Sequence, residues 1–228
     1  MRSLTGIFAI ALTLALTACS EEQAEAPAAP PAKTETAPPA AAPDSATADE
    51  AKTADDEASV QAEPFFAQMV LQDVTFQVES PNDSSINQVA IRAEGPEGPI
   101  GQMEAEADGT ITNVEIEDLN ADGYPEMYVY VTSAGSGSYG SLIAYASNQN
   151  KSLSQIYLPS IEDDPAISKG YMGHDEFAVG EATFLRRFPI YKDGDINAQP
   201  TGGTRQIQYK LEAGEAGWIL RQDRVVEF

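Results

Sequence analysis

The sequence predicts an all-β fold, namely an antiparallel β-sandwich or flattened barrel of about 8–10 short strands, preceded by a disordered amino-terminal tether. From Pro64 onward, short runs rich in Val, Ile, Tyr, Phe and Thr are separated by Gly, Asn and Asp turn signals. In the run from Thr204 to Leu211, apolar and polar residues alternate with the period of a strand. No stretch shows a sustained helical period with capping residues.

The first residues are expected to be a secretion signal. Arg2 supplies a positive charge, and Leu4 to Leu16 is an apolar stretch too short to span a bilayer. The following Leu16-Thr17-Ala18-Cys19 looks like the lipobox of bacterial lipoproteins, in which the signal is cut before the cysteine and the cysteine carries lipid. Residues 1–18 are therefore expected to be a signal peptide. The Ser at position 20 favours, by the same resemblance, an outer-membrane lipoprotein facing the periplasm.

Residues 19–62 are expected to form a lipidated cysteine and a disordered tether. This segment consists mainly of Ala, Pro, Glu, Asp and Thr, and has no large apolar residue before Val60. It cannot bury enough surface to offset the entropy cost of ordering. Because Cys19 is the only cysteine, no disulfide is predicted. Residues 63–228 are then the folded domain.

Strand-like runs divide this domain. In sequence order they are 69–78, 88–93, 110–116, 126–132, 141–147, 176–179, 182–191, 204–211 and 217–221. The dipeptide Asp108-Gly109 before the third run is typical of a hairpin. Arg186 and Arg187 are neighbours in one strand and so point to opposite faces; both are expected at the solvent or the rim. Trp218 is expected in the core or at its rim.

Charge limits the partners. The chain of 228 residues has 13 Lys and Arg against 36 Asp and Glu, and a net charge of −23. Nucleic acid is excluded as a partner, because phosphate binding needs clustered basic residues. A basic partner is favoured, although acidity that only keeps an envelope protein soluble explains the composition equally well.

The stretch from Ser133 to Gly140 connects two strand-like runs and is expected to be the tip of a hairpin. It is rich in Gly and Ser and has one aromatic residue, Tyr139. Such a tip is a poor core element, and its shape suits entry into another protein's cleft. Residues 135–140 fit the G-x-G-x-x-G pattern, but a strand follows where a dinucleotide site needs a helix. No cofactor is predicted.

His174, the only histidine, is the residue on which a hydrolase would have to be built. A catalytic triad would require it beside Ser136 or Ser138 with an orienting acid such as Asp175. A histidine in a turn is the simpler interpretation, and one histidine argues against a catalytic zinc.

The segment 118–126 places oxygen-bearing side chains at alternate positions, with Gly at the sixth. This spacing matches the first half of an EF-hand loop, but the twelfth position, where a Glu is needed, is Val129. An Asx-rich turn explains the same residues. No metal is assigned, and calcium binding by this segment is left open. Its candidate ligands are Asp118, Asn120, Asp122 and Glu126.

Ser136-Gly137-Ser138-Tyr139 resembles the S-G-x-Y loop motif of the periplasmic inhibitors of invertebrate-type (I-type) lysozyme. Further stretches also look like that family, and the resemblance extends roughly from Asp118 to Phe228. They are 118–126, Tyr145, 152–159 and 171–177.

The resemblance implies a lysozyme inhibitor, not an enzyme, that inserts the Ser136–Tyr139 loop into the cleft of a lysozyme and protects peptidoglycan. Ser136 would direct its hydroxyl at the catalytic acids, and Tyr139 would be the anchor. Gly135, Gly137 and Gly140 would let the backbone fit a narrow cleft. The alternative function is a calcium-stiffened envelope module that binds glycan or protein. The oligomeric state is not predicted.

Overall fold

The structure is a computed structural model that describes residues 63–228, which lie in one compact unit. The expected signal peptide, Cys19 and the tether lie outside the described residues. Within 63–228, no helix has both the length and the apolar character to cross a membrane. Strands make up nearly all of the regular structure, so the prediction of an all-β fold is confirmed.

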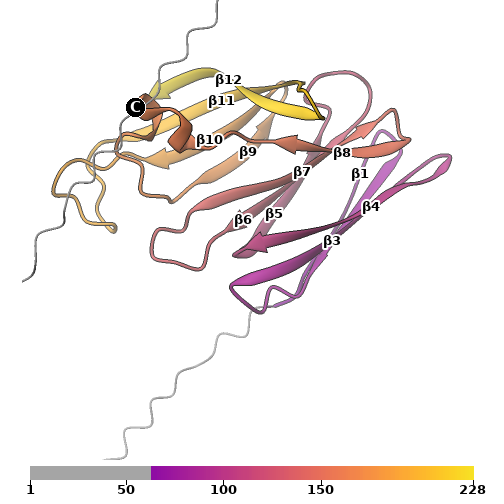
Figure 1. Ribbon diagram of the computed structural model, residues 1–228, viewed down its shortest axis with the longest axis horizontal. Helices are drawn as coiled ribbons and strands as arrows, with labels where there is room; N and C mark the ends of the chain where they lie inside the picture. Colours follow the sequence, from indigo (N-terminus) through magenta and orange to yellow (C-terminus); the bar gives the residue numbers. More distant parts are fainter. Residues whose placement is uncertain (1–62) are drawn as a thin grey trace, which may run out of the picture. The chain divides into compact units, whose positions relative to one another are not determined.

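Four antiparallel strands form a small sheet (Figure 1), in the order β1-β2-β3-β4. The strands are β1 (Phe65–Leu71), β2 (Val74–Ser80), β3 (Ile86–Gly95) and β4 (Gly98–Asp108). In β2 every second side chain is fully buried, which is the pattern of a strand with one face on a core.

The other eight strands form a large sheet in the order β5-β6-β7-β8-β12-β11-β10-β9. All neighbours are antiparallel except β8 and β12, which run parallel over a short register. The strands are β5 (Thr110–Glu117), β6 (Glu126–Thr132), β7 (Gly140–Asn148), β8 (Ser152–Tyr157), β9 (Glu176–Gly180), β10 (Thr183–Pro189), β11 (Thr204–Ala213) and β12 (Trp218–Glu227). A 3₁₀ turn, η1 (Ile161–Asp163), and a one-turn helix, α1 (Pro165–Ser168), follow β8.

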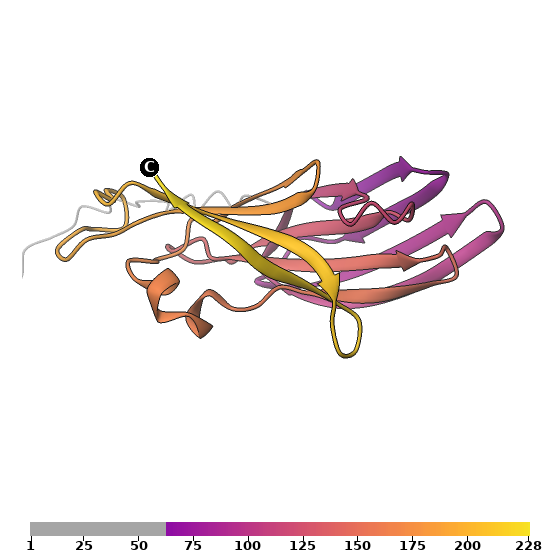
Figure 2. The ribbon, with the colours of Figure 1, turned by 90° about the horizontal axis from the view of Figure 1, so that it is seen from above.

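The large sheet has a hydrophobic core on each face. The small sheet packs on β5 to β8 and makes the first core, with Phe76, Ile91 and Val129 among its buried members. The second core lies on the other face and includes Tyr128 and Phe184. Figure 2 shows that the small sheet covers only one end of the large sheet, while β11 and β12 extend past it. β6 therefore buries side chains on both faces.

The large sheet curls around the second core until its two edge strands meet. The backbone N–H of Val179 in β9 donates to Oε2 of Glu115 in β5 at 2.8 Å. The hydroxyl of Tyr130 donates to the same carboxylate oxygen. The fold thus combines the two predicted architectures: a sandwich at the small sheet and a nearly closed barrel beyond it.

Three expectations about strands are wrong. The run 69–78 is not one strand, because Gln72 and Asp73 turn the chain with φ of 52° and 60° between β1 and β2. β4 and β8 were not among the expected strands, so the described residues hold twelve strands rather than eight to ten. Asp108-Gly109 does not make a hairpin, because the chain passes there from the small sheet to the large one.

Candidate functional site

The hairpin predicted around Ser133–Gly140 is confirmed. β6 and β7 pair from Glu126 opposite Ala146 to Thr132 opposite Gly140. The connecting residues, called here the 133–139 loop, close with two bonds between Ser133 and Tyr139: backbone N–H of Ser133 to the Tyr139 carbonyl at 2.9 Å, and N–H of Tyr139 to the Ser133 hydroxyl at 3.0 Å. N–H of Ser138 donates to the Gly135 carbonyl at 3.0 Å, which makes a compact turn at the tip.

The tip of the loop presents its two distinctive side chains to solvent. Ser136 is exposed, and Tyr139 keeps 48% of its surface accessible. Gly137 and Ser138 are half-buried. The edge of the Tyr139 ring meets the ring of Tyr171, with centroids 5.6 Å apart and planes at 76°. The phenol is therefore held in one place while remaining available to a partner.

The three loop glycines have different roles. A Cβ on Gly137 would lie 2.3 Å from Cε2 of Tyr139, so only glycine lets that ring fold back over the loop. A Cβ on Gly140 would lie 2.5 Å from Cβ of Asp175. Gly135 has open space around it. The packing thus explains why positions 137 and 140 lack a side chain.

A buried ion pair lies beneath the carboxyl-terminal end of the loop. Nε of Arg186 is 2.7 Å from Oδ1 of Asp175, and the two side chains are 7% and 0% exposed. The other carboxylate oxygen of Asp175 accepts from the N–H of Gly140 at 2.7 Å and from the Tyr171 hydroxyl at 2.6 Å. Burial opposes the guanidinium charge, but the Asp175 hydrogen bond and charge outweigh it and raise the pKa of Arg186.

The expectation that Arg186 lies at the solvent or the rim is therefore wrong. Arg186 and Arg187 do point to opposite faces, but only Arg187 is exposed. The guanidinium of Arg186 also lies 5.4 Å from the ring centroids of Tyr171 and Phe177. A charge that is paired and faces aromatic rings can stay in the interior.

His174 lies against the 133–139 loop, but it does not form a catalytic triad. Its Nε2 is 3.0 Å from Oδ1 of Asn197, and the Asp175 carboxylate bonds to Arg186 and Tyr171 rather than to His174. It lies in the irregular segment before β9, with φ of 58° in the left-handed region. The geometry of residues 63–228 therefore gives no support to a hydrolase built on His174.

The acidic segment 118–126 precedes β6. One oxygen from each of Asp118, Asp122 and Glu126 lies within 4.8 Å of the others. The Asp118 carboxylate accepts from the backbone N–H groups of Asp122 and Gly123, as expected for an Asx-rich turn. Glu126 is buried and accepts from Leu119 N–H at 2.7 Å. Burial, followed by the nearby acids, raises the pKa of Glu126 to about 8.

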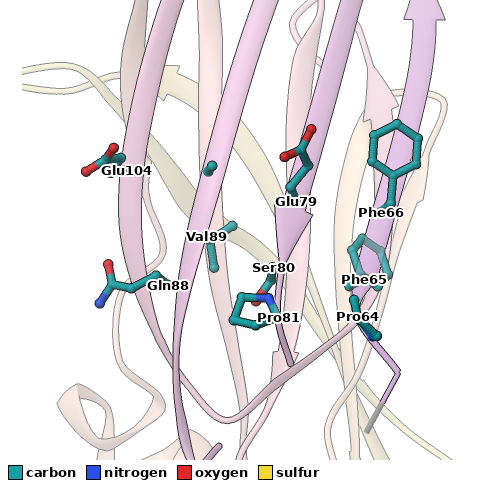
Figure 3. Close-up of a pocket in the computed structure, with 10 residues that line it drawn as sticks. Pro64, Phe65, Phe66, Glu79, Ser80, Pro81, Gln88, Val89 and Glu104 are labelled. Carbon is teal, nitrogen blue, oxygen red and sulfur yellow. The ribbon is translucent and has the colours of Figure 1, made fainter. Parts of the chain in front are cut away.

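The described surface has several hollows, and one of them lies beside the 133–139 loop. A groove of about 390 Å³ runs beside the 133–139 loop and is lined by Tyr139, Leu142, Pro159 and Tyr171, among others. A larger one of about 740 Å³ lies on the small sheet, and none of the predicted site residues line it. Figure 3 shows its labelled side chains spread over neighbouring strands instead of converging on one point. The groove by the loop is thus the one associated with the candidate site.

Sequence reasoning found the loop but missed the residues that support it. Asp175 and Asn197 lie 35 and 61 residues beyond the loop atoms they bind. Nothing local in the sequence links such distant positions. The sequence offers one hint of this support. Arg186 lies two residues from both Phe184 and Phe188, on the face of β10 that is buried.

Comparison with known proteins identifies relatives. Residues 100–167, which include the 133–139 loop, match the model of a family described as periplasmic lysozyme inhibitor of I-type lysozyme. No curated protein matches the chain.

Two solved structures of PliI from Aeromonas hydrophila are each 31% identical to the chain and cover 40% of it, with TM-scores of 0.35 and 0.36. The first is a complex with a lysozyme from Meretrix lusoria. The matched regions cover 80% and 84% of the Aeromonas chains. With this identity over most of a relative's length, and a family model matched across the loop, the chain belongs to the family of periplasmic inhibitors of I-type lysozyme.

Proposed function

We propose that this protein inhibits an I-type lysozyme by inserting the 133–139 loop into the active-site cleft. A family of inhibitors is not one of enzymes, in agreement with the prediction from sequence. A relative was crystallised with a lysozyme, which supports a lysozyme as the partner. The observation that carries the proposal is the exposed Tyr139 on a loop whose ends are tied to a buried ion pair and a paired hairpin.

The chemistry of the target explains why such a loop inhibits. A lysozyme cleft uses two carboxyl groups, one of which must stay protonated to act as the acid. The exposed Ser136 hydroxyl can donate to a carboxylate there, and the loop excludes sugar and water. The Tyr139 ring supplies apolar contact area with few rotatable bonds to immobilise, as hot-spot residues do.

The experiment is a turbidity assay of cell-wall lysis in which the purified protein is titrated against I-, c- and g-type lysozymes. Tyr139→Ala is expected to weaken inhibition of the I-type enzyme at least about tenfold, because a hot-spot ring contributes about 2 kcal/mol or more. Circular dichroism and thermal melting should show an unchanged fold, since the ring is half exposed.

Phe66→Ala is the matched control, because Phe66 is an aromatic residue 62% exposed on β1 of the small sheet. It should inhibit like the wild type. Equal potency of Tyr139→Ala and the wild type would remove the loop from the mechanism. Failure of the wild type against every lysozyme would reject inhibition itself.

We further propose that the protein acts at the outer membrane, facing the periplasm, where it protects peptidoglycan. The family description supports the periplasm. The Leu16–Cys19 motif supports a lipid anchor on Cys19, and residues 20–62 have the composition of a spacer between that anchor and the folded domain.

A further inference from the structure

We propose that Asn197 is a positioning residue that, with His174, holds the 133–139 loop in its binding shape. This inference rests on the proposed function, since it assigns a role in the same loop. Asn197 lies in the connection between β10 and β11, called here the 192–201 loop (Lys192–Thr201). Figure 1 shows this connection at the same end of the fold as the β6–β7 hairpin tip.

The side chain of Asn197 bridges two elements. Its Nδ2 donates to the backbone carbonyl of Ser136. Its Oδ1 lies 3.0 Å from Nε2 of His174. Because an amide oxygen can only accept, Nε2 must carry the proton, which fixes the tautomer of a neutral His174. Asn197 is thus the link between the tip of the loop and the segment beneath it.

The backbone of His174 continues this contact along the loop. Its N–H donates to the carbonyls of Gly137 at 2.8 Å and Ser138 at 3.2 Å. Three successive loop carbonyls, those of residues 136 to 138, are therefore bound by Asn197 and His174. With these carbonyls facing the protein, the Ser136 and Tyr139 side chains are left on the exposed side of the loop.

Asn197 is itself held in place. The Tyr191 hydroxyl donates to its backbone carbonyl at 2.8 Å. The Asp195 carboxylate closes the 192–201 loop by accepting from the N–H groups of Lys192 at 2.7 Å and Thr201 at 2.8 Å. N–H of Gln199 donates to the Ile196 carbonyl at 2.9 Å. Because this support is independent of the 133–139 loop, Asn197 can act as a fixed point for it.

A loop fixed before binding loses less conformational freedom when it enters a cleft. Without the Asn197 contacts, the loop would populate its binding shape for only a fraction of the time, and the apparent affinity would fall to that fraction of its intrinsic value. The effect should appear as weaker inhibition together with greater motion of the loop.

The test compares three variants of the whole protein. Asn197→Ala removes both contacts, and Asn197→Asp keeps the acceptor for His174 but places an oxygen against the Ser136 carbonyl. Gln199→Ala is the control, because Gln199 is exposed in the same 192–201 loop and its side chain makes no hydrogen bond within residues 63–228. The readouts are inhibition of an I-type lysozyme, hydrogen–deuterium exchange of residues 133–140, and thermal melting.

Both Asn197 variants are expected to weaken inhibition about tenfold and to accelerate exchange in residues 133–140, while Gln199→Ala matches the wild type. Unchanged inhibition and exchange in both Asn197 variants would overturn the proposal. So would weaker inhibition without faster exchange, because Asn197 would then contact lysozyme directly. If Asn197→Ala has a clearly lower melting temperature than the wild type, the inhibition and exchange of Asn197→Asp alone test the proposal.

If the wild type inhibits no lysozyme, the proposed function fails. The exchange measurement still tests whether Asn197 orders the loop.

Discussion

At the scale of single residues, Arg186 and Arg187 are neighbours in one strand but lie in different environments. Arg186 is buried on Asp175, whereas Arg187 is exposed and donates to Gln206 on the neighbouring strand. Periodicity alone predicts opposite faces. It does not predict that one face is a packed interior in which a carboxylate pairs with Arg186. Asp175 comes close to Arg186 only when the chain has folded.

Replacing each arginine by alanine separates the two environments. Arg186→Ala leaves the Asp175 carboxylate buried without its cation, and is expected to lower the free energy of unfolding by about 3–5 kcal/mol. Arg187→Ala is expected to change it by no more than about 0.5 kcal/mol. Urea unfolding followed by fluorescence measures both. Similar midpoints for the two variants would contradict the role given to the ion pair.

Glu126 makes stability depend on pH. Its pKa is raised from 4.5 to about 8 in the folded state, chiefly by burial. Below pH 4.5 the carboxyl is protonated in both states. Between 4.5 and 8 the unfolded chain loses the proton first, so stability falls as pH rises, and above 8 the loss is complete. The free energy of unfolding lost in this way amounts to several kcal/mol, at about 1.4 kcal/mol per unit of pKa.

Glu126→Gln cannot ionise and keeps an acceptor for the Leu119 N–H. It should unfold at a higher temperature than the wild type above pH 8 and at a similar one near pH 4.5. Melting curves from pH 4.5 to 9 in EDTA measure this difference. Parallel curves for the two proteins would show that Glu126 is not the titrating group. If calcium added to the wild type removes the pH dependence, the 118–126 segment binds the ion, because a cation lowers the pKa of a carboxyl beside it.

At the scale of elements, the β6–β7 hairpin and the segment from Tyr171 to Asp175 work as a pair. The hairpin was predictable, because a Gly- and Ser-rich stretch separates two apolar runs. Its support was not, because the contacts join residues far apart in the chain and several of them involve backbone groups. N–H of His174 reaches the Gly137 carbonyl only because Gly173 allows a very close approach. No sequence pattern predicts such a close approach of two backbone segments.

Two glycines test this close approach. Gly173 and Gly123 both have φ of 87°, so alanine suffers the same left-handed strain at each. A Cβ on Gly173 would lie 2.0 Å from the Gly137 carbonyl oxygen, whereas Gly123 has nothing within 4 Å. Gly173→Ala is expected to displace the loop and weaken inhibition more than about tenfold on hot-spot scales. Gly123→Ala should inhibit like the wild type.

Inhibition and melting temperature are measured for both glycine variants. Equal inhibition by the two, at equal stability, would show that the loop tolerates movement of the segment beneath it.

Other elements show where sequence patterns were insufficient. β4 carries alternating Ala and Glu, residues depleted in strands, so its sequence does not predict a strand although Ala107 is buried. The turn at Gln72 and Asp73 contains no glycine, which made β1 and β2 read as one strand. The dipeptide Asp108-Gly109 is typical of a hairpin, but here the chain changes sheets. Glycine is required at this point for another reason, because a Cβ on Gly109 would lie 2.1 Å from the Thr132 carbonyl oxygen.

At the scale of the whole molecule, the fold class and both architectures could be predicted, because alternation and turn residues are local properties. The pairing of β8 with β12 could not, because it joins strands separated by more than fifty residues. The same division applies to the site: the Ser136–Tyr139 loop is local, and its supports are not.

The predicted anchor also belongs to this scale. Protein produced in a bacterium should sediment with outer membranes and partition into detergent, because each buried CH₂ of an acyl chain contributes about 0.8 kcal/mol. Cys19→Ala should abolish lipid labelling and membrane association. Wild-type protein recovered without lipid in the soluble periplasmic fraction would refute anchoring. Lysozyme inhibition by that protein would still be tested separately, by the turbidity assay.

The parallel contact between β8 and β12 has a consequence for biogenesis. In the strand ladder, only two residue pairs join the first four strands of the large sheet to the last four: Trp218 with Ile156, and Ile219 with Tyr157. The strand made last thus occupies the middle of the sheet. The hairpin bearing Tyr139 is synthesised well before β12, so the complete eight-stranded order of the sheet can form only after β12 has been made.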